Sequence, residues 1–333
     1  MVGPVSAGMA EPTDSDSQPG GNRKRRSSPI YLDHASAEDT RPGVLPRPDA
    51  SRRIAFGWYG GKFSHLGWLL PLLPNCHHYC EPFSGSGAVL LNREPSPLET
   101  YNDLDGNVVH FFKVLRDHRE ELMQACALTP FSREEYYGAV HGAEGLSEVE
   151  RARRFFIRAR QTRMGLAQTA VLCRWANCKQ NSSGGMASAI ARWLGGVEGL
   201  GEVAERLLRV QIENRPAVDA IRLYDSPDTL FYCDPPYVHS SRTDLKAYAF
   251  EMDDEQHREL AAALNSIQGK AALSGYRCDL MDELFKGWQR YDAPARQIAS
   301  TKAMRQESLW ANYDLEALMK AAAPEPNGEL LLF

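Results

Sequence analysis

One short stretch limits the possible folds of this chain more than any other. The apolar run Leu230-Phe231-Tyr232-Cys233 is followed directly by Asp234-Pro235-Pro236-Tyr237. The run predicts a buried strand, and the prolines turn the chain where that strand ends, because proline neither continues a helix nor donates to a sheet. Open α/β sheets bind ligands at this end of their strands. There Asp234 and the Pro235 carbonyl can both accept hydrogen bonds from one exocyclic amine, and Tyr237 can stack on its ring. Such residues also form ordinary turns.

A second motif lies upstream, in Tyr79–Leu91. A strand is predicted to end near Glu81, and Gly85-x-Gly87 predicts a turn whose backbone comes close to a ligand before a helix begins. The motif lacks the third glycine of dinucleotide sites and the Gly-Lys-Ser/Thr of phosphate loops. The next predicted strand ends at Asp103, 16 to 18 residues beyond the glycines, where an acid can hold ribose hydroxyls. An adenosine-like ligand without a pyrophosphate is therefore expected, and S-adenosylmethionine fits.

With these motifs placed, the chain resembles the Dam-type (class D12, alpha-group) DNA N6-adenine methyltransferases. Three segments match in that type's order: Trp58-Tyr59-Gly60-Gly61-Lys62, Glu81-Pro82-Phe83-Ser84-Gly85-Ser86-Gly87 and Asp234-Pro235-Pro236-Tyr237. The resemblance covers roughly residues 54–115 and 205–315. It implies a site-specific, adenine-specific DNA methyltransferase that moves a methyl group from S-adenosylmethionine to N6 of a flipped-out adenine. It also implies a Rossmann-like α/β sheet with helices on both faces and an inserted, mainly helical target-recognition region.

The resemblance also implies roles for single residues. The catalytic positions are Asp234, Pro235, Pro236 and Tyr237. The cofactor positions comprise Trp58 and Lys62 at the methionine end, Glu81, Phe83, Gly85 and Gly87 around the turn, Asp103 at the ribose, Ile212 against the adenine ring, and Asp234. The stretches Leu273-Ser274-Gly275-Tyr276 and Glu307-Ser308-Leu309-Trp310 look like the family's last strands.

A basic block separates the cofactor motif from the catalytic one. Between Arg151 and Lys179 there are seven arginines and one lysine, with no acid. Phosphate contact is a natural use of such a block, although a solvated helix face has the same composition. The net charge of −5 is not the overall signature of a nucleic-acid binder, so the placement of the block carries the argument. The residues expected to contact double-stranded DNA are Arg158, Arg160, Arg163, Arg174, Lys179, Asn181 and Arg242.

Composition narrows the setting of the protein. The sequence has no 18-residue apolar run and no apolar leader, so neither a membrane span nor secretion is expected. Seven scattered cysteines fit a reduced cytoplasm, and the family resemblance implies a bacterial or phage-infected cell. Cys76, His77, His78 and Cys80 have the residue types of a zinc site, but they lead into the cofactor strand and no metal is expected.

The chain divides into five predicted segments. They are a disordered tail at 1–50, a catalytic domain in two parts at 51–118 and 206–322, a recognition insertion at 119–205, and a C-terminal tail at 323–333. Helices are predicted at 64–73, 88–92, 105–118, 132–142, 148–164, 200–209 and 253–267. Strands are predicted before Glu81 and Asp234 and at 99–103, 209–213, 270–275, 289–292 and 306–311. The stretch 165–200 is predicted to be rich in loops, and 239–247 to form a loop over the target base.

The C-terminal residues Glu329-Leu330-Leu331-Leu332-Phe333 resemble a sliding-clamp-binding peptide, with Glu329 in place of its glutamine. Packing of this tail on its own domain is the alternative. The protein is expected to act as a monomer.

Other functions use related catalytic motifs. A cytosine N4 amine, an RNA adenine or a glutamine amide could be the acceptor, and a DNA-binding relative could have lost catalysis. The basic block argues against the glutamine amide. The intact Asp234, Tyr237 and glycines argue against lost catalysis.

Overall fold

The computed structural model describes residues 52–141, 145–163, 174–241, 250–297 and 304–322. Side chains at 296, 297, 304, 305 and 322 lie outside this description. So do the predicted tails at 1–50 and 323–333, Arg242, and most of the predicted loop at 239–247.

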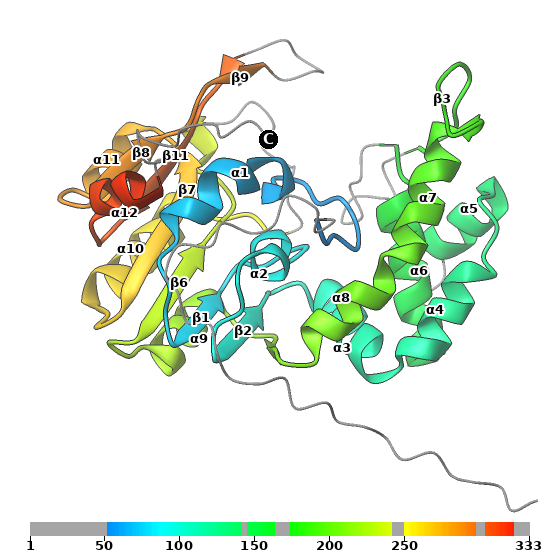
Figure 1. Cartoon of the computed structure of the whole chain (residues 1–333), viewed down its shortest axis with the longest axis horizontal. Coiled ribbons are helices and arrows are strands. Elements are labelled where there is room, and N and C mark those ends of the chain that lie inside the picture. Colours follow the sequence, from blue (N-terminus) through cyan, green and yellow to red (C-terminus); the bar gives the residue numbers. More distant parts are fainter. Residues whose placement is uncertain (1–51, 142–144, 164–173, 242–249, 298–303, 323–333) are drawn as a thin grey trace, which may run out of the picture. The chain divides into compact units, whose positions relative to one another are not determined.

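Seven strands of the described chain form one sheet, in the order β5-β2-β1-β6-β7-β11-β8 (Figure 1). Strands β5, β2, β1, β6 and β7 run parallel, and β11 runs antiparallel to its neighbours β7 and β8. The chain builds outward from β1 to β2 and β5 and then returns to β6 on the other side of β1. The strand order therefore reverses between β1 and β6, which is where open α/β sheets place their ligands. The strands are β1 His78–Glu81, β2 Leu98–Asn102, β5 Gln211–Glu213, β6 Thr229–Cys233, β7 Lys270–Tyr276, β8 Gln289–Asp292 and β11 Glu307–Ala311.

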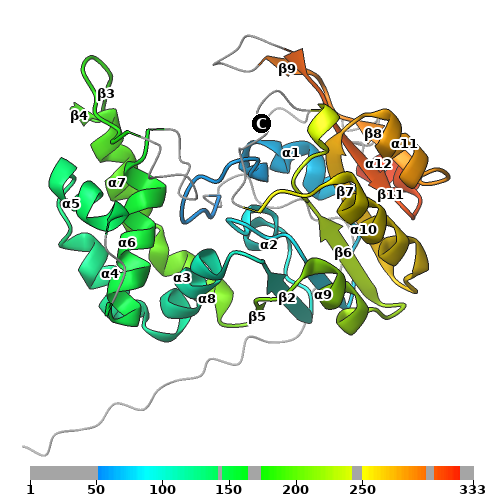
Figure 2. The same cartoon turned by 180° about the vertical axis from the view of Figure 1, so that it is seen from behind.

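Helices cover both faces of this sheet (Figures 1 and 2). Side chains alternate along each strand, so Leu230 and Tyr232 join one apolar core while Phe231 and Cys233 join another. The first core contains residues of α1 Leu66–Leu69, α2 Ala88–Asn92, α3 Gly106–Asp117 and α12 Leu315–Ala322. The second contains residues of α9 Ala217–Tyr224, α10 Asp254–Ser266 and α11 Asp279–Leu284. The expected Rossmann-like sheet with helices on both faces is confirmed.

A group of helices lies between β2 and β5 in the chain. It comprises α4 Arg119–Ala127, α5 Arg133–Val140, α6 Glu148–Gln161, α7 Ser188–Glu198 and α8 Leu200–Leu207. Helix α6 packs on α3, α4, α5 and α7. It starts at Ser147, whose hydroxyl accepts from the Glu150 amide, and it buries Phe155 and Phe156, the latter stacked on Phe111 of α3. Short strands complete the described elements: β3 Ser182–Ser183 pairs with β4 Met186–Ala187, and β9 Arg296–Gln297 with β10 Met304–Arg305.

Two predicted segments are wrong. The single helix predicted at 64–73 is three short pieces, namely the 3₁₀ turns η1 Lys62–His65 and η2 Leu70–Leu72 with α1 between them. Pro71 at the start of η2 cannot donate to a continuing helix. The stretch 165–200, predicted to be rich in loops, contains α7, which buries Trp193. Within α7, the Arg160 guanidinium fills the space that a Cβ at Gly196 would occupy.

The other predicted helices are confirmed to within a few residues. Helices α4, α9, α11 and α12 were not predicted, nor was the one-turn 3₁₀ helix η4 His239–Ser241. No helix in the described ranges is long and apolar enough to cross a membrane.

Candidate active site

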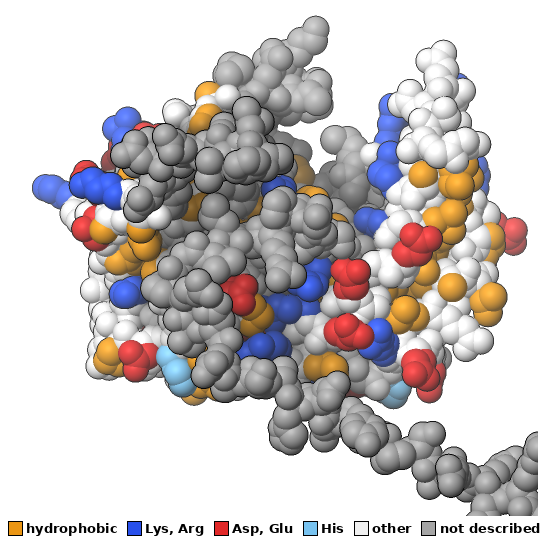
Figure 3. All heavy atoms as spheres, in the orientation of Figure 1, with side chains coloured by type: hydrophobic (Ala, Val, Ile, Leu, Met, Phe, Trp, Pro, Cys, Tyr) orange, Lys and Arg blue, Asp and Glu red, His pale blue; other side chains and the backbone are white. Residues whose placement is uncertain are grey.

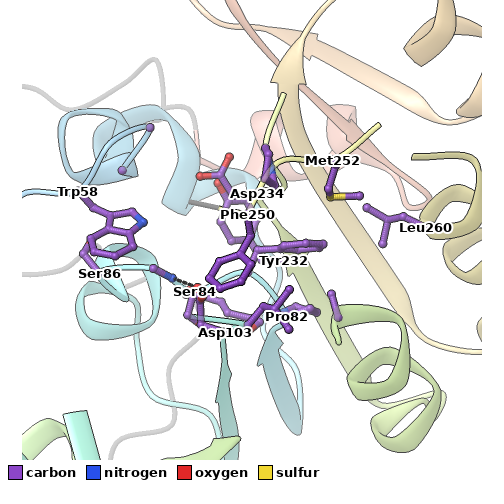
Figure 4. Close-up of a pocket in the computed structure, with 18 of the residues that line it drawn as sticks. Trp58, Pro82, Ser84, Ser86, Asp103, Tyr232, Asp234, Phe250, Met252 and Leu260 are labelled. Atoms are coloured by element: carbon purple, nitrogen blue, oxygen red, sulfur yellow. Dashed lines mark hydrogen bonds between the residues drawn. The ribbon is translucent and has the colours of Figure 1, made fainter. Parts of the chain in front are cut away.

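A cavity of about 360 Å³ opens at the carboxyl ends of β1, β2 and β6 (Figure 4). Trp58 and Ser86 lie at one end of it, Met252 and Leu260 at the other, and Asp234 and Phe250 between them. Its volume is in the range typical of small-molecule sites. Much of the remaining wall comes from Gly60–Lys62, Glu81–Gly85, Asp103, the start of α9 at Pro216–Asp219, and Gln256 and Glu259 of α10.

The glycine turn between β1 and α2 forms one wall of the cavity. Gly85 and Gly87 have φ of 51° and 64°, a region that side chains disfavour. The Gly85 amide donates to Asp103 Oδ2 at 2.7 Å, and its carbonyl accepts from the Tyr101 hydroxyl at 2.6 Å. A Cβ on Gly85 would lie 2.6 Å from the Trp58 indole. The turn therefore has room for Trp58 only because residue 85 has no side chain.

Asp103 follows β2 and lines the cavity beside the glycine turn. Its other oxygen, Oδ1, accepts from the Asp105 amide at 2.8 Å. Burial raises the pKa of Asp103 to about 6, while these backbone donors oppose the rise. The group is therefore mainly a carboxylate at neutral pH, with further lone pairs available for a ligand hydroxyl.

Lys62 is a buried cation that joins the N-terminal segment to the end of β6. Its side chain is 1% exposed, and its Nζ lies 2.7 Å from both carboxylate oxygens of Asp234. The Lys62 ammonium also donates to the Tyr237 hydroxyl at 2.8 Å and to the Gly60 carbonyl at 2.9 Å. Burial alone would lower the pKa of Lys62, but the nearby carboxylates outweigh burial and raise it. The lysine is therefore charged.

Asp234 has a second donor on the neighbouring strand. The Ser274 hydroxyl on β7 donates to Asp234 Oδ1 at 2.8 Å. Burial raises the pKa of Asp234, and the Lys62 ammonium opposes that rise because it favours the ionised form of the carboxyl. From β11, Glu307 accepts from the Tyr237 hydroxyl at 2.9 Å and lies 3.5 Å from Lys62 Nζ. Sequence reasoning placed Ser274 and Glu307 only on strands and missed these contacts, since sequence position does not show that β7 and β11 follow β6 in the sheet.

Glu81 ends β1 and is 2% exposed. It accepts a hydrogen bond from the Tyr79 hydroxyl at 2.7 Å. Burial raises the pKa of Glu81 to about 8, so the group holds its proton at neutral pH. A positive charge placed in the cavity would favour its ionised form.

The structure brings most of the predicted cofactor and catalytic residues together, but not all. Those that line the cavity are Trp58, Lys62, Glu81, Phe83, Gly85, Asp103, Asp234 and Pro236. Gly87 caps α2 behind the turn. Ile212, on β5, pairs with Tyr101 of β2 and packs on the core, so it does not line the cavity. Residues Pro216–Asp219, just after β5, line the cavity. Pro235 and Tyr237 border a much smaller space beside Ser274 and Tyr276.

The predicted DNA-contacting residues fall into two groups. Arg158 and Arg160 are half-buried, and they donate to the carbonyls of Ala139 and Arg192 at 2.8 Å and 2.5 Å. Burial lowers the pKa of Arg158, and that of Arg160 to about 10. These two side chains therefore brace the helices. By contrast, the side chains of Arg163, Arg174, Lys179 and Asn181 are exposed.

No group of three potential metal ligands is present among the described residues. Of the zinc-like segment, His78 bonds the Thr100 hydroxyl at 2.9 Å and Cys80 is fully buried in the sheet.

Comparison with known proteins identifies the family. The model of the D12 class N6 adenine-specific DNA methyltransferases matches residues 58–306, which is about three quarters of the chain. The match begins at Trp58, spans every residue that lines the cavity, and ends beside Glu307. A search of curated proteins finds no significant match.

This family methylates adenine N6 in DNA and uses S-adenosylmethionine. The cavity has the chemistry for that cofactor. Asp103 offers a carboxylate to sugar hydroxyls, the glycine turn leaves backbone open to a close ligand, and Trp58 and Phe250 offer apolar surface. Motif, fold and site agree with the family match, and the chain belongs to the D12 class of N6 adenine-specific DNA methyltransferases.

Proposed function

We propose that Asp234, the Pro235 carbonyl and Tyr237 hold the target adenine at the mouth of the cavity described above. The observation that carries this assignment is the Asp234 carboxylate, which lines the cavity and is fixed by Lys62 and Ser274. The target base must leave the duplex to reach it, and unstacking costs a few kcal/mol. Stacking on the Tyr237 ring offsets part of that cost.

The chemistry follows from the acceptor atoms. The N6 amine is conjugated to the ring and is a poor nucleophile. Two acceptors, Asp234 and the Pro235 carbonyl, favour a pyramidal nitrogen whose lone pair points into the cavity. S-adenosylmethionine supplies the methyl group on a positively charged sulfur. As the N–CH3 bond forms, the S–CH3 bond breaks and positive charge moves to nitrogen, so a preorganised Asp234 carboxylate would stabilise the transition state without first taking a proton. The charged nitrogen would then lose its extra proton readily.

The cofactor assignment rests on the walls of the cavity. We assign Trp58, Glu81, Phe83, Gly85 and Asp103 to cofactor binding because their atoms line one continuous space. We assign Lys62 to Asp234 and not to the methionine end of the cofactor, because Gly60, Asp234 and Tyr237 accept from all three of its N–H groups.

Helices α4 to α8 form most of the proposed recognition region, residues 119–205, within a catalytic domain made of residues 51–118 and 206–322. Its exposed cations include Arg163, Arg174, Lys179 and Arg192, and it carries a hairpin whose turn is Gly184-Gly185. Figure 3 shows Lys and Arg side chains along one edge of the region that carries α7 and this hairpin. Such a row suits phosphates, and Asn181 suits a base edge.

The proposed setting is a monomer acting on DNA in the cytoplasm of a bacterial or phage-infected cell. The oligomeric state stays a prediction; the cavity, Asp234 and the exposed cations all belong to one chain. Clamp binding through Leu330–Phe333 remains a prediction, since those residues lie outside the described structure. Deleting 329–333 and measuring clamp binding tests it, and unchanged binding would reject it.

Two variants of one residue test the catalytic assignment. Asp234→Ala is expected to abolish methyl transfer while cofactor affinity, measured by calorimetry, changes little. Asp234→Asn keeps the shape and one acceptor oxygen but loses the charge, so it should retain a small residual rate. Methylation by Asp234→Ala at the unmodified rate would remove Asp234 from the mechanism.

A further inference from the structure

Glu307 is a half-buried acidic residue next to the catalytic residues. It begins β11, and its side chain is 11% exposed. One oxygen accepts from the Tyr237 hydroxyl at 2.9 Å and lies 3.5 Å from Lys62 Nζ. The other lies 3.9 Å from His65 Nε2. Glu307 does not line the cofactor cavity, so neither cofactor binding nor amine binding uses it directly.

Lys62, Asp234 and Glu307 form a charge cluster, and the position of Lys62 bears on how well Asp234 can accept a hydrogen bond from the amine. A lysine against both oxygens of a single carboxylate would cancel its charge and weaken it as an acceptor. Positive charge develops on N6 during transfer, so a neutralised Asp234 would stabilise it poorly. Glu307 is the second carboxylate on the same ammonium. Lys62 therefore faces two acidic side chains and cannot pair fully with both.

We propose that Glu307 is a positioning residue for methyl transfer: it shares the charge of Lys62, so that Asp234 keeps negative charge toward the amine, and it fixes the Tyr237 hydroxyl. This inference rests on the proposed role of Asp234. The geometry supports the charge sharing and the fixing of the hydroxyl. Lys62 donates to both Asp234 and Tyr237, and the Tyr237 hydroxyl in turn donates to Glu307. Tyr237 is held on a second side by Tyr276, with ring centroids 4.6 Å apart.

If Glu307 had only a structural role, its negative charge would not be needed. The backbone of Glu307 already pairs with β7, and its carbonyl accepts from the Ala293 amide at 2.8 Å. A glutamine at 307 would keep these backbone bonds and an oxygen for the Tyr237 hydroxyl. Only the negative charge would be lost, which makes Glu307→Gln the informative substitution.

The dependence of the methylation rate on pH separates a structural role of Glu307 from its proposed role in sharing the charge of Lys62. The Glu307 carboxylate raises the pKa of Asp234, after burial and against the opposing effect of Lys62. Loss of that charge therefore lowers the pKa of Asp234 and moves the acid limb of the rate to lower pH. The plateau rate nevertheless falls, because Lys62 then neutralises Asp234. Among the residues that the structure describes, the other titratable groups around Lys62, Asp234 and Glu307 include Glu81, Tyr232, Cys233, Tyr276, Tyr237 and His65.

The experiment is single-turnover methylation of duplex DNA by the full chain across pH, with cofactor affinity measured in parallel. For Glu307→Gln we expect a plateau about tenfold lower, equivalent to about 1.4 kcal/mol of barrier, an acid limb at lower pH and unchanged cofactor affinity. Glu307→Asp should recover part of the plateau. Repeating the comparison in a His65→Gln background removes the protonation of His65 as a cause of the shift.

An unchanged plateau, or a lower plateau with an unmoved acid limb, would overturn the inference. A double-mutant cycle with Tyr237→Phe adds a second criterion, because a role only through the tyrosine hydroxyl predicts that Glu307→Gln has no effect in that background. Failure of the proposed function is recognised separately, by an active Asp234→Ala. An inactive Asp234→Ala together with a fully active Glu307→Gln would reject only the role of Glu307.

Discussion

The indole of Trp58 occupies the space that a side chain at Gly85 would fill. This contact joins the N-terminal motif to the glycine turn across the cavity wall, although the two residues belong to separate motifs of the sequence. The turn and the tryptophan therefore form one surface, and a change in either should alter cofactor binding.

Gly85→Ala tests this surface. Alanine at a φ of 51° is strained by about 1–2 kcal/mol, and its methyl group would displace Trp58. We expect cofactor affinity to fall by at least about tenfold in calorimetry, or about 1.4 kcal/mol. The control is Gly138→Ala in helix α5, where a Cβ meets no atom within 4 Å and up to about 1 kcal/mol of stabilisation is expected. Equal affinity in the two variants would contradict the shared surface.

A buried ion pair links the last helix of the proposed recognition region to the sheet. Arg206 of α8 donates to both oxygens of Glu99 on β2 and to the Leu90 carbonyl, and the Glu99 side chain is fully buried. Arg206→Ala removes the two shortest donors to that carboxylate and leaves it the Ser96 amide and the more distant Arg209, so a loss of about 3 kcal/mol in unfolding free energy is expected. Arg209 lies 3.7 Å from the same carboxylate but is 49% exposed, and Arg209→Ala should cost at most about 1 kcal/mol. Urea unfolding of both variants measures the difference, and similar losses would show that burial of the pair is unimportant.

The protonated Glu81 makes stability depend on pH. Its pKa is raised to about 8 in the folded state, so the folded protein holds a proton that the unfolded chain releases near its ordinary value. The contribution of Glu81 is fully present below that ordinary value and is lost as pH rises through about 8, with a slope of about 1.4 kcal/mol per unit. In cofactor-free protein, Glu81→Gln should therefore gain stability relative to the unsubstituted chain between pH 5.5 and 8. A difference that stays constant across that range would show that Glu81 does not titrate in this way.

The exposed cations of the recognition region should contribute through phosphates. Arg174→Ala and Lys179→Ala are each expected to weaken binding to all DNA sequences alike and to reduce the slope of log affinity against log salt by about 0.9. Arg222→Ala removes the same charge from α9, where the side chain is 64% exposed, and should leave the slope unchanged. Fluorescence anisotropy at several salt concentrations gives the slopes. Identical slopes in all three variants would exclude Arg174 and Lys179 from the interface.

Local patterns in the sequence predicted much of this fold. The run before Asp234 and the alternation of strands with helices correctly placed the sheet, and the two prolines marked the strand end that borders the cavity. Helix α7 was missed because Gly195 and Gly196 are poor helix formers, and its stability comes from burying Trp193 and packing on α6. The pattern of α7 alone does not contain those tertiary contacts.

The charge cluster was beyond prediction for a related reason. Lys62 and Asp234 are 172 residues apart, and they meet because the N-terminal segment crosses the end of β6. Glu307 joins them from β11, which enters the sheet beside β7 against the direction of its neighbours. The motif predicts a cofactor role for Lys62, which does line the cavity, but it does not show that the Lys62 ammonium donates to Gly60, Asp234 and Tyr237.

The most direct measurement of the central claim uses S-adenosylmethionine labelled in its methyl group. The purified full chain is incubated with it and unmethylated genomic DNA, and the DNA is digested and its labelled nucleoside identified. The account predicts label in N6-methyladenine with the unsubstituted chain and none with Asp234→Ala. Label in N4-methylcytosine, or no label while cofactor binding is intact, would contradict it.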